Sequence, residues 1–550
     1  MKKQNAIQIT FAIISACVLI LLLIVFIVPL IVAFLPLFRD SFGELKDFSF
    51  RVGKIALFTV QQAFCSMLIS LIIGIPTAFF VARRQFFGRK FLLSLSSVPF
   101  CFPALLVALG FVMTYGMQGF INKFFMKIFD LNESPITFLY SFLGIIIIHG
   151  FYNFPIVMRI CSDSWQQLPV DEKNAATMLG ANSFRIFRTV TFFQLLPAIS
   201  SSAIMAFLYS FFSFIIVLLF GGIGISVLEV EIYQAVRSSL DFNYAAILSF
   251  VETFIAFLII IFYTVIEKKS KRSKGIAFYE EVSIRSSIKS IKEKICLFII
   301  FVFIFLFFLL PFFSIILSAF KNSQIGYLQK SLFSFLSFDN FIKLFSRQSF
   351  FYAFINTILI GIATGFLSVI AASFFCCFQK YFLEKQNFIS KIIPLLPMAV
   401  SSIVLGFGIM QVIPKGNIFC LILLQSALCW PLAYKQIFAQ MEKIPNDVLY
   451  VGKILSKNSL DSVFKICLPM CKKSMFSAFG LCFAISCGDT NLPLIMAIPK
   501  LETLALYTYK LASSYRFYES CACGIILALL TVPIFILSNQ IEKRTEKGKN

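Results

Sequence analysis

Long apolar stretches alternate with short polar segments along almost the whole chain. A helix needs about 20 apolar residues to cross the roughly 30 Å hydrocarbon layer of a membrane, and stretches of that length recur throughout the sequence. Continuous apolar runs exclude a β-barrel, because barrel strands alternate at every second residue. The pattern therefore predicts an all-α polytopic membrane protein with about 12 transmembrane helices. These spans are expected at residues 11–37, 55–82, 91–115, 137–160, 194–220, 244–266, 295–320, 351–378, 390–413, 417–438, 472–498 and 518–539.

Lysine and arginine are concentrated in every second loop between these spans. Cytoplasmic loops carry such an excess, and an even number of spans places both termini on the same side. The alternate loops, such as 39–54, 123–133 and 229–241, mix acidic with basic residues. We therefore expect both termini to be cytoplasmic and the protein to lie in a bacterial inner membrane. The basic clusters are Lys2–Lys3, Arg83–Lys90, Lys268–Lys274, Lys380–Lys391 and Lys543–Arg544.

The composition limits what else the chain could be. It is 59% hydrophobic and 13% charged, with a mean hydropathy of +0.90, which excludes a soluble globular domain. The net charge of +22 does not indicate nucleic-acid binding, because the cations lie in short loops rather than in a soluble basic domain. The 15 cysteines form no C-x-x-C pair, so neither a metal site nor a redox motif is predicted.

The sequence also contains an internal repeat. Pro155 and Pro431 are 276 positions apart, and so are Pro169 and Pro445. The same offset therefore relates the two halves from their fourth span into the loop that follows it. The polar stretch 267–294 is the expected cytoplasmic linker between two six-span halves. The expected division is an N-terminal span with its external loop at 1–50, a first half at 51–266, the linker at 267–294, a leading span with its loop at 295–350, a second half at 351–540 and a cytoplasmic tail at 541–550.

One cytoplasmic segment, 168–197, has the pattern of a helix, a turn and a second helix. Pro169 can open the first helix, and Glu172 suits its first turn. Ala175 and Ala176 favour helix, Gly180 can end it, and Asn182 or Ser183 can cap the next helix.

This segment resembles the EAA coupling loop of the permeases of binding-protein-dependent ABC importers, in which an acidic residue, two alanines and a glycine recur at this spacing. The resemblance implies two type I permease halves, and it implies that the loop docks on a separate ATPase. The second half carries an altered copy, with Asp447, with Gly452 in the position of Ala176, and with Ser456 in the position of Gly180. Because serine adopts left-handed backbone less readily than glycine, the second loop is expected to contribute less to coupling.

The chain contains no G-x-x-x-x-G-K-[ST] phosphate-binding motif. ATP and magnesium are therefore expected on a partner, and this chain is expected to bind no cofactor and to contain no catalytic or metal-binding residue. The resemblance implies two copies of the ATPase, an external substrate-binding protein and contact with membrane lipid.

Within the importers, residues 51–543 resemble the fused permeases of the thiamine and ferric-iron systems, and most of all the thiamine permeases. The resemblance implies transport of thiamine or its phosphates, with ferric iron as the alternative cargo. The segments that carry it are Tyr115–Phe120, His149–Pro155, Glu231–Ala235, Gly488–Asp489 and Thr503–Arg516.

Several polar residues are candidates for the substrate path. Asp489 and Glu252 fall in or beside spans, where carboxylates are costly and often functional. Asp489 could attract a cation, and Tyr507, Tyr509 and Tyr515 could stack on a cationic aromatic ring. Alternatively, Asp489 caps a helix and the tyrosines belong to an interfacial belt.

Two further features suggest packing. His149 is the only histidine, and a packed, hydrogen-bonded residue is a simpler interpretation than a proton relay. Gly361 and Gly365 are spaced for a close helix contact.

Three other classes of protein must be weighed. A secondary transporter could also have twelve spans in two halves, without an ATPase. The repeated coupling-loop pattern argues against it. A membrane-embedded enzyme would need convergent catalytic groups, and no such motif appears in the spans. A structural membrane protein is the remaining alternative.

Overall fold

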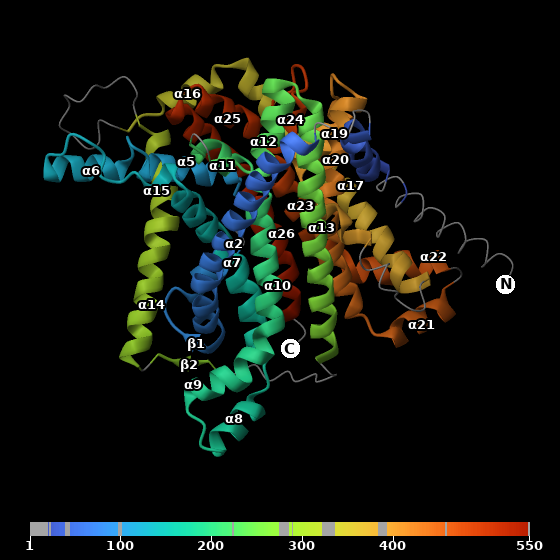
Figure 1. Ribbon diagram of the computed structural model, residues 1–550. Helices are drawn as coiled ribbons and strands as arrows, with labels where there is room; N and C mark the ends of the chain where they lie inside the picture. The colour runs from blue at the N-terminus through green and yellow to red at the C-terminus, as the bar shows by residue number, and fades with distance from the viewer. Residues whose placement is uncertain are drawn as a thin grey trace.

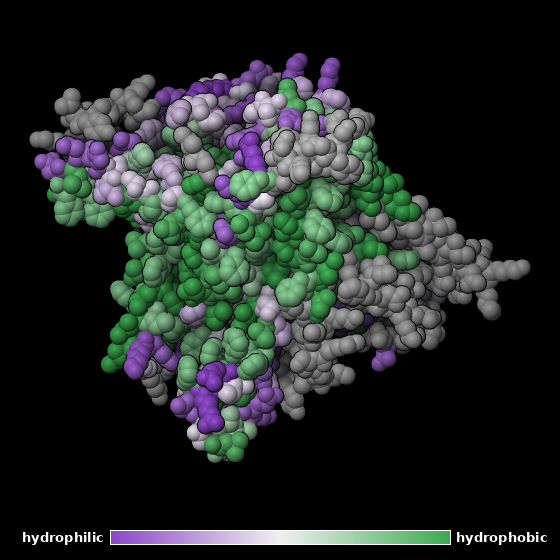
Figure 2. Space-filling model, in the orientation of Figure 1, coloured by the Kyte–Doolittle hydropathy of each residue, from purple (hydrophilic) through white to green (hydrophobic). Residues whose placement is uncertain are grey.

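The computed structural model describes residues 20, 24–38, 45–96, 102–222, 225–273, 285–288, 290–321, 336–382, 393–456 and 459–547. Long helices form one bundle, in which an apolar belt separates two polar ends (Figures 1 and 2). Ten of the described helices are long and apolar enough to cross a membrane, or eleven if one sharply bent pair counts as a span. The predicted all-α polytopic fold is confirmed. The count of twelve stays a prediction, because span 11–37 lies partly outside the described residues and its described end is a shorter apolar helix, Ile24–Phe38.

The described residues of the first half form eleven α-helices. A two-residue strand, β1 (Arg84–Gln85), follows the first of them. The helices are α2 (Leu45–Arg83), α3 (Arg89–Leu95), α5 (Ala104–Tyr115), α6 (Phe120–Phe129), α7 (Phe142–Gln166), α8 (Val170–Met178), α9 (Ser183–Ile186), α10 (Phe192–Phe211), α11 (Ile215–Phe220) and α12 (Leu228–Gln234). The long helix α13 (Phe242–Ser273) then closes the half and extends into the expected linker.

The second half opens with strand β2 (Ser286–Ser287), which pairs in parallel with β1. Arg84 Nε donates a hydrogen bond at 3.0 Å to Glu293, so the end of the linker region is fastened to the first half. The helices are α14 (Ile291–Ile304), α15 (Leu310–Ala319), α16 (Asp339–Phe345), α17 (Gln348–Phe382), α19 (Ser402–Val412), α20 (Ile418–Glu442), α21 (Asn446–Leu455), α22 (Ser459–Ser462), α23 (Leu468–Gly488), α24 (Asn491–Met496), α25 (Leu504–Ser513) and α26 (Phe517–Lys547).

Both halves pack in the same way. In the first half α2, α7 and α10 are packed against one another, and in the second half α17, α20 and α23 form the same set of contacts. The repeat also extends to single hydrogen bonds. The backbone amide of Leu228 donates to Thr59 Oγ1 at 3.0 Å, and that of Leu504, 276 positions later, donates to Thr357 Oγ1 at 2.7 Å.

Two π-helical segments, η3 (Phe187–Thr191) and η8 (Val463–Cys467), are likewise 276 positions apart. Each joins a short helix to the long span that follows it, η3 leading into α10 and η8 into α23. A π-helix carries one extra residue in its turn and is costly in isolation, so such segments are often found at functional positions. Two more π-helices, η4 (Ala235–Ser239) and η5 (Phe305–Leu309), lie elsewhere in the described chain.

The third predicted span of each half has a proline next to a helix start or a bend. In the first half, α5 begins directly after Pro103. In the second half, the 3₁₀ segment η7 (Ile393–Ala399) meets α19 at an angle of 91°. Proline lacks an amide hydrogen and disfavours helix in the residue before it, which accounts for the helix start and the bend.

The glycine pair predicted to mark a close helix contact does so. A Cβ atom on Gly361 would lie 2.6 Å from Cys487 Sγ, and one on Gly365 would lie 3.0 Å from the ring of Phe479. Both neighbours belong to α23, so these glycines of α17 allow the two helices to approach closely.

Candidate functional site

A cavity of about 360 Å³ lies between the two halves. From the first half it is lined by residues of α5, α7, α10, α11 and α12. From the second half it is lined by residues of η7, α19, α20 and α23, and by the segment that leads into α24. Because equivalent elements of the repeat meet here, the cavity lies where relative movement of the halves would change its shape.

The polar lining of this cavity is acidic. The described lining residues include two carboxylates, Glu229 and Asp489, and no lysine or arginine. The chain as a whole has 48 basic and 26 acidic residues. The cavity thus has the opposite charge balance to the rest of the protein.

On the first-half wall, His149 lies between two hydrogen-bond partners. Its Nδ1 is 2.6 Å from Gln62 Nε2, and its Nε2 is 2.5 Å from Ser213 Oγ. With the Gln62 amide donating to Nδ1, the neutral ring donates from Nε2 to the serine hydroxyl. His149 is buried and hydrogen-bonded, as predicted, and it also lines the cavity.

On the second-half wall, Asp489 accepts two hydrogen bonds. Gln425 Nε2 donates to one carboxylate oxygen at 3.0 Å, and the backbone amide of Asn491 donates to the other at 3.0 Å. The second bond ties Asp489, at the end of α23, to the first residue of α24, and Asp489 also lines the cavity. Both roles considered for Asp489 from the sequence are therefore compatible with its position.

Glu229 and Glu252 form a second acidic feature. Both side chains are 1% exposed, and they interact electrostatically with each other. Ser401 is a polar neighbour of both carboxylates, yet none of their four oxygens has a hydrogen-bond partner among the described residues. Glu229 lines the cavity, and Glu252 is on α13. The sequence placed Glu229 in an external loop, whereas in the structure it belongs to the partly buried helix α12.

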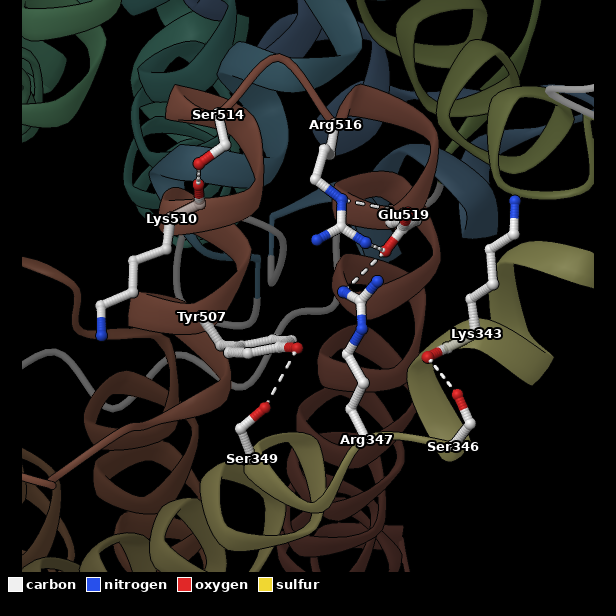
Figure 3. A network of polar contacts seen from close by, with 9 residues as sticks. All are labelled: Lys343, Ser346, Arg347, Ser349, Tyr507, Lys510, Ser514, Arg516 and Glu519. Carbon is white, nitrogen blue, oxygen red and sulfur yellow. Dashed lines mark hydrogen bonds and ion pairs between the residues drawn. The ribbon is translucent and has the colours of Figure 1, made fainter.

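The three tyrosines proposed for the path do not line this cavity. Tyr507 is buried, and its hydroxyl accepts a hydrogen bond from Ser349 at 3.4 Å (Figure 3). Tyr509 is partly buried in the main core, and Tyr515 is 85% exposed. Nearby, Glu519 binds both Arg347, at 3.0 Å, and Arg516, so the segment 503–516 takes part in a network that holds α25 and α26 to the start of α17 (Figure 3).

Other aromatic and amide groups occupy the cavity wall instead. Tyr152, Asn153 and Tyr209 line it, and the side-chain oxygen of Asn153 has no hydrogen-bond partner among the described residues although it is fully buried. One sequence signal could have found part of this wall. His149 and Gln425 are 276 positions apart, as are Ser213 and Asp489, so the repeat register relates the polar groups on the two sides.

The segment 168–197 folds as predicted. Pro169 precedes α8, Gly180 has φ of +79° just beyond the end of that helix, and the Asn182 side chain accepts from the Arg185 amide at 2.8 Å to cap α9. Glu172 accepts a hydrogen bond from Gln194 of α10. The loop therefore contacts the membrane-spanning helix that follows it, and it projects from the bottom of the bundle in Figure 1.

The second copy of this segment, at 444–456, differs in structure from the first copy at the position where its sequence also differs. Asp447 lies in the first turn of α21, and Gly452 packs so closely that a Cβ atom would lie 2.7 Å from Ile466 Cδ1. Ser456 ends α21 with φ of −84° and ψ of 143°, which is extended backbone. The left-handed turn of Gly180 is therefore absent at its counterpart in the second half.

Large apolar side chains are exposed at both loops. Met178 and Leu179 at the end of α8 are 90% and 87% exposed, and Leu455 in α21 is 80% exposed. Leu179 and Leu455 are equivalent in the repeat. These residues were not among those predicted from the sequence, although large apolar residues in a short segment between spans are a recognisable signal of a binding surface.

Residues 71–272, which contain α7, the segment 168–197 and α10, match the family of binding-protein-dependent transport system inner membrane components. The predicted resemblance of the chain to fused two-half permeases is confirmed. The thiamine transport system permease protein of Escherichia coli is 24% identical over 504 residues, which cover 89% of each chain. That of Brucella abortus is 23% identical over 513 residues, covering 91% of this chain and 90% of the relative. A putative 2-aminoethylphosphonate transport system permease protein of Salmonella typhi is 27% identical over 212 residues, covering 38% of this chain and 73% of the relative.

Proposed function

We propose that this chain forms the translocation path of an ABC importer that carries thiamine, or a phosphorylated form of it, across a bacterial inner membrane. A separate ATPase docks on the two coupling loops, one copy on each, and supplies ATP hydrolysis with magnesium. A substrate-binding protein delivers the cargo at the opposite end of the bundle. Both termini and the linker 267–294 are cytoplasmic.

The observation that carries the proposal is the connection from each coupling loop to the cavity. The first loop continues through η3 into α10, which brings Tyr209 to the cavity wall, and the second continues through η8 into α23, which brings Ser486 there. A displacement of either loop is therefore passed along a single continuous helix to the cavity. This is the arrangement that alternating access driven by a partner ATPase requires.

Two features support thiamine as the cargo. The relatives that cover about nine tenths of this chain are named as thiamine permeases. Thiamine also contains a permanently cationic aromatic ring, and the cavity combines carboxylates with the aromatic side chains of Tyr152 and Tyr209.

The test is uptake into vesicles that contain the chain, its ATPase and its binding protein. We expect labelled thiamine to enter only with ATP, and vanadate to stop its entry. Uptake of ferric iron without uptake of thiamine would overturn the assignment of thiamine as the cargo, but the assignment as an importer permease would stand. Thiamine uptake without the ATPase would instead indicate a secondary transporter.

A further inference from the structure

One helix of the first half, α6, has no counterpart in the second half. Residues 116–141 separate α5 from α7 and contain α6, whereas only residues 413–417 separate α19 from α20, and the structure describes both stretches in full. The register of the repeat resumes directly afterwards, because α7 begins at Phe142 and α20 begins 276 positions later, at Ile418. The helix α6 is therefore an addition to the frame that the two halves share.

The helix α6 extends sideways from the bundle, at the boundary between the apolar belt and the polar end remote from the segment 168–197 (Figures 1 and 2). Together α5 and α6 are long and apolar enough to cross a membrane, but residues 116–119 separate the two helices, and α6 runs across the direction of the long spans (Figure 1). Over α6, apolar side chains gather on the side toward the belt and polar side chains on the opposite side (Figure 2). This is the placement of a helix that lies in the plane of a membrane surface.

The sequence of α6 is amphipathic. Phe120, Phe124 and Ile128 are four residues apart, so they form one apolar row along the helix, and they are 56%, 53% and 57% exposed. Lys123 and Lys127 form a second row beside it. Large apolar side chains are unfavourable in water, so a continuous exposed row of them indicates a surface that an apolar phase covers.

A buried asparagine fixes the position of α6. The Nδ2 group of Asn122 donates to the carbonyl oxygens of Gly116, at 2.9 Å, and Ile136, at 2.8 Å, and its Oδ1 accepts from the backbone amide of Ile136 at 2.9 Å. The Ser134 hydroxyl donates to the carbonyl oxygen of Met117 at 2.7 Å. These bonds fasten α6 and the segment after it to the end of α5, the helix whose first residues line the cavity.

We propose that α6 lies in the membrane surface, with the apolar row Phe120, Phe124 and Ile128 at the boundary between headgroups and acyl chains. Lys123 and Lys127 then reach the phospholipid phosphates, as lysines beside an apolar surface commonly do. The occupant is lipid rather than a protein, because the apolar side of α6 faces the belt and continues it, whereas a protein that docks at this end of the bundle meets the polar side (Figure 2). The inference depends on the membrane-spanning fold and not on the cargo.

The test measures how close α6 lies to lipid. Phe124→Trp is made in the full chain, and the purified protein is placed in vesicles whose phospholipids carry bromine, which quenches tryptophan fluorescence on contact. The native Trp165 and Trp430 are buried, and the signal of the wild-type chain is subtracted to remove their contribution.

Two further variants provide the references. Phe254→Trp lies at an exposed position near the middle of the span Phe242–Val265, where it meets the acyl chains. Met178→Trp lies at a position that is 90% exposed on the segment 168–197, at the opposite end of the bundle from α6.

We expect bromine to quench Phe124→Trp at least about twofold more strongly than Met178→Trp. An interfacial helix buries its apolar face by only about 5–10 Å, so bromine near the headgroup should quench Phe124→Trp more than bromine deep in the acyl chains. Phe254→Trp should show the reverse dependence on bromine depth. Quenching of Phe124→Trp no stronger than that of Met178→Trp would overturn the proposal, and Ile128→Trp on the same row gives an independent measurement if Phe124→Trp fails to assemble.

A second measurement separates lipid from a protein partner. A photoreactive phenylalanine analogue replaces Phe124 in vesicles that contain the chain, its ATPase and its binding protein. We expect illumination to attach phospholipid to this position, as identified by peptide mass. A cross-link to the binding protein without any to phospholipid would overturn the proposal and indicate that α6 is a docking surface for that protein.

Discussion

Gln425 donates a hydrogen bond to Asp489 at the place where, in the first half, His149 contacts Ser213. The two pairs occupy the same positions of the repeat, yet only the pair in the second half includes a carboxylate. The two sides of the cavity are therefore built from equivalent positions of the repeat but carry different charges. The segment 168–197 and its counterpart at 444–456 likewise share an overall helix pattern and differ locally, at Gly180 and Ser456.

Replacing Gly180 by valine should uncouple ATP hydrolysis from uptake while the protein still inserts. At φ of +79° a β-branched side chain is strained by about 1–2 kcal/mol or more, and no neighbouring atom lies within 4 Å to add a steric effect. Uptake per ATP hydrolysed, measured in vesicles, should fall about tenfold. The matched control is Ser456→Val, where extended backbone accepts valine, and an equal loss at both positions would contradict the asymmetry between the loops.

Replacing Leu179 by aspartate should weaken binding of the ATPase. This side chain is 87% exposed, so its burial against a partner would account for about 1.5–3 kcal/mol, or at least tenfold in affinity. The measurement is retention of the ATPase by the purified permease. Lys173→Ala on the same exposed helix is the control, and unchanged retention in Leu179→Asp would show that α8 does not dock through its apolar end.

The orientation can be tested by labelling single cysteines in a chain whose native cysteines have been removed. A cysteine at Ser273, where α13 ends, should resist an impermeant external reagent, because the lysines and arginines around it indicate the cytoplasm. A cysteine at Ser514, which is exposed beyond α25, should react. The reverse pattern would invert the topology.

Replacing Gly361 by alanine should destabilise the protein by about 1–3 kcal/mol, because the new methyl group would lie 2.6 Å from Cys487 Sγ and force α17 and α23 apart. Thermal unfolding in detergent would measure the effect. Gly53→Ala is the matched change, since no atom lies within 4 Å of that position, and it should leave the unfolding temperature unchanged or slightly raised. A similar loss at both glycines would mean that helix contact does not explain the effect at Gly361.

Local features of this fold could be predicted from sequence because they depend on neighbouring residues. The helix start at Pro169, the turn at Gly180 and the cap at Asn182 each follow from the preferences of one residue. The positions of Tyr507 and Glu229 could not be predicted from sequence, because they depend on which helices, distant in the sequence, pack against these residues. Tyr507 reaches Ser349, more than 150 residues away, and Glu229 was assigned to a loop because carboxylates in a polar stretch resemble exposed ones.

The π-helices η3 and η8 determine which face of α10 and of α23, two of the helices that line the cavity, is turned toward it. Each adds one residue to a turn, which rotates everything after it by about 100° relative to an uninterrupted α-helix. Deleting one residue from Phe187–Thr191 would therefore rotate α10 about its axis and turn Ser210, whose hydroxyl accepts from Asn153 at 3.0 Å, away from α7. The composition of α10 would be unchanged, but a different face of the helix would meet the cavity.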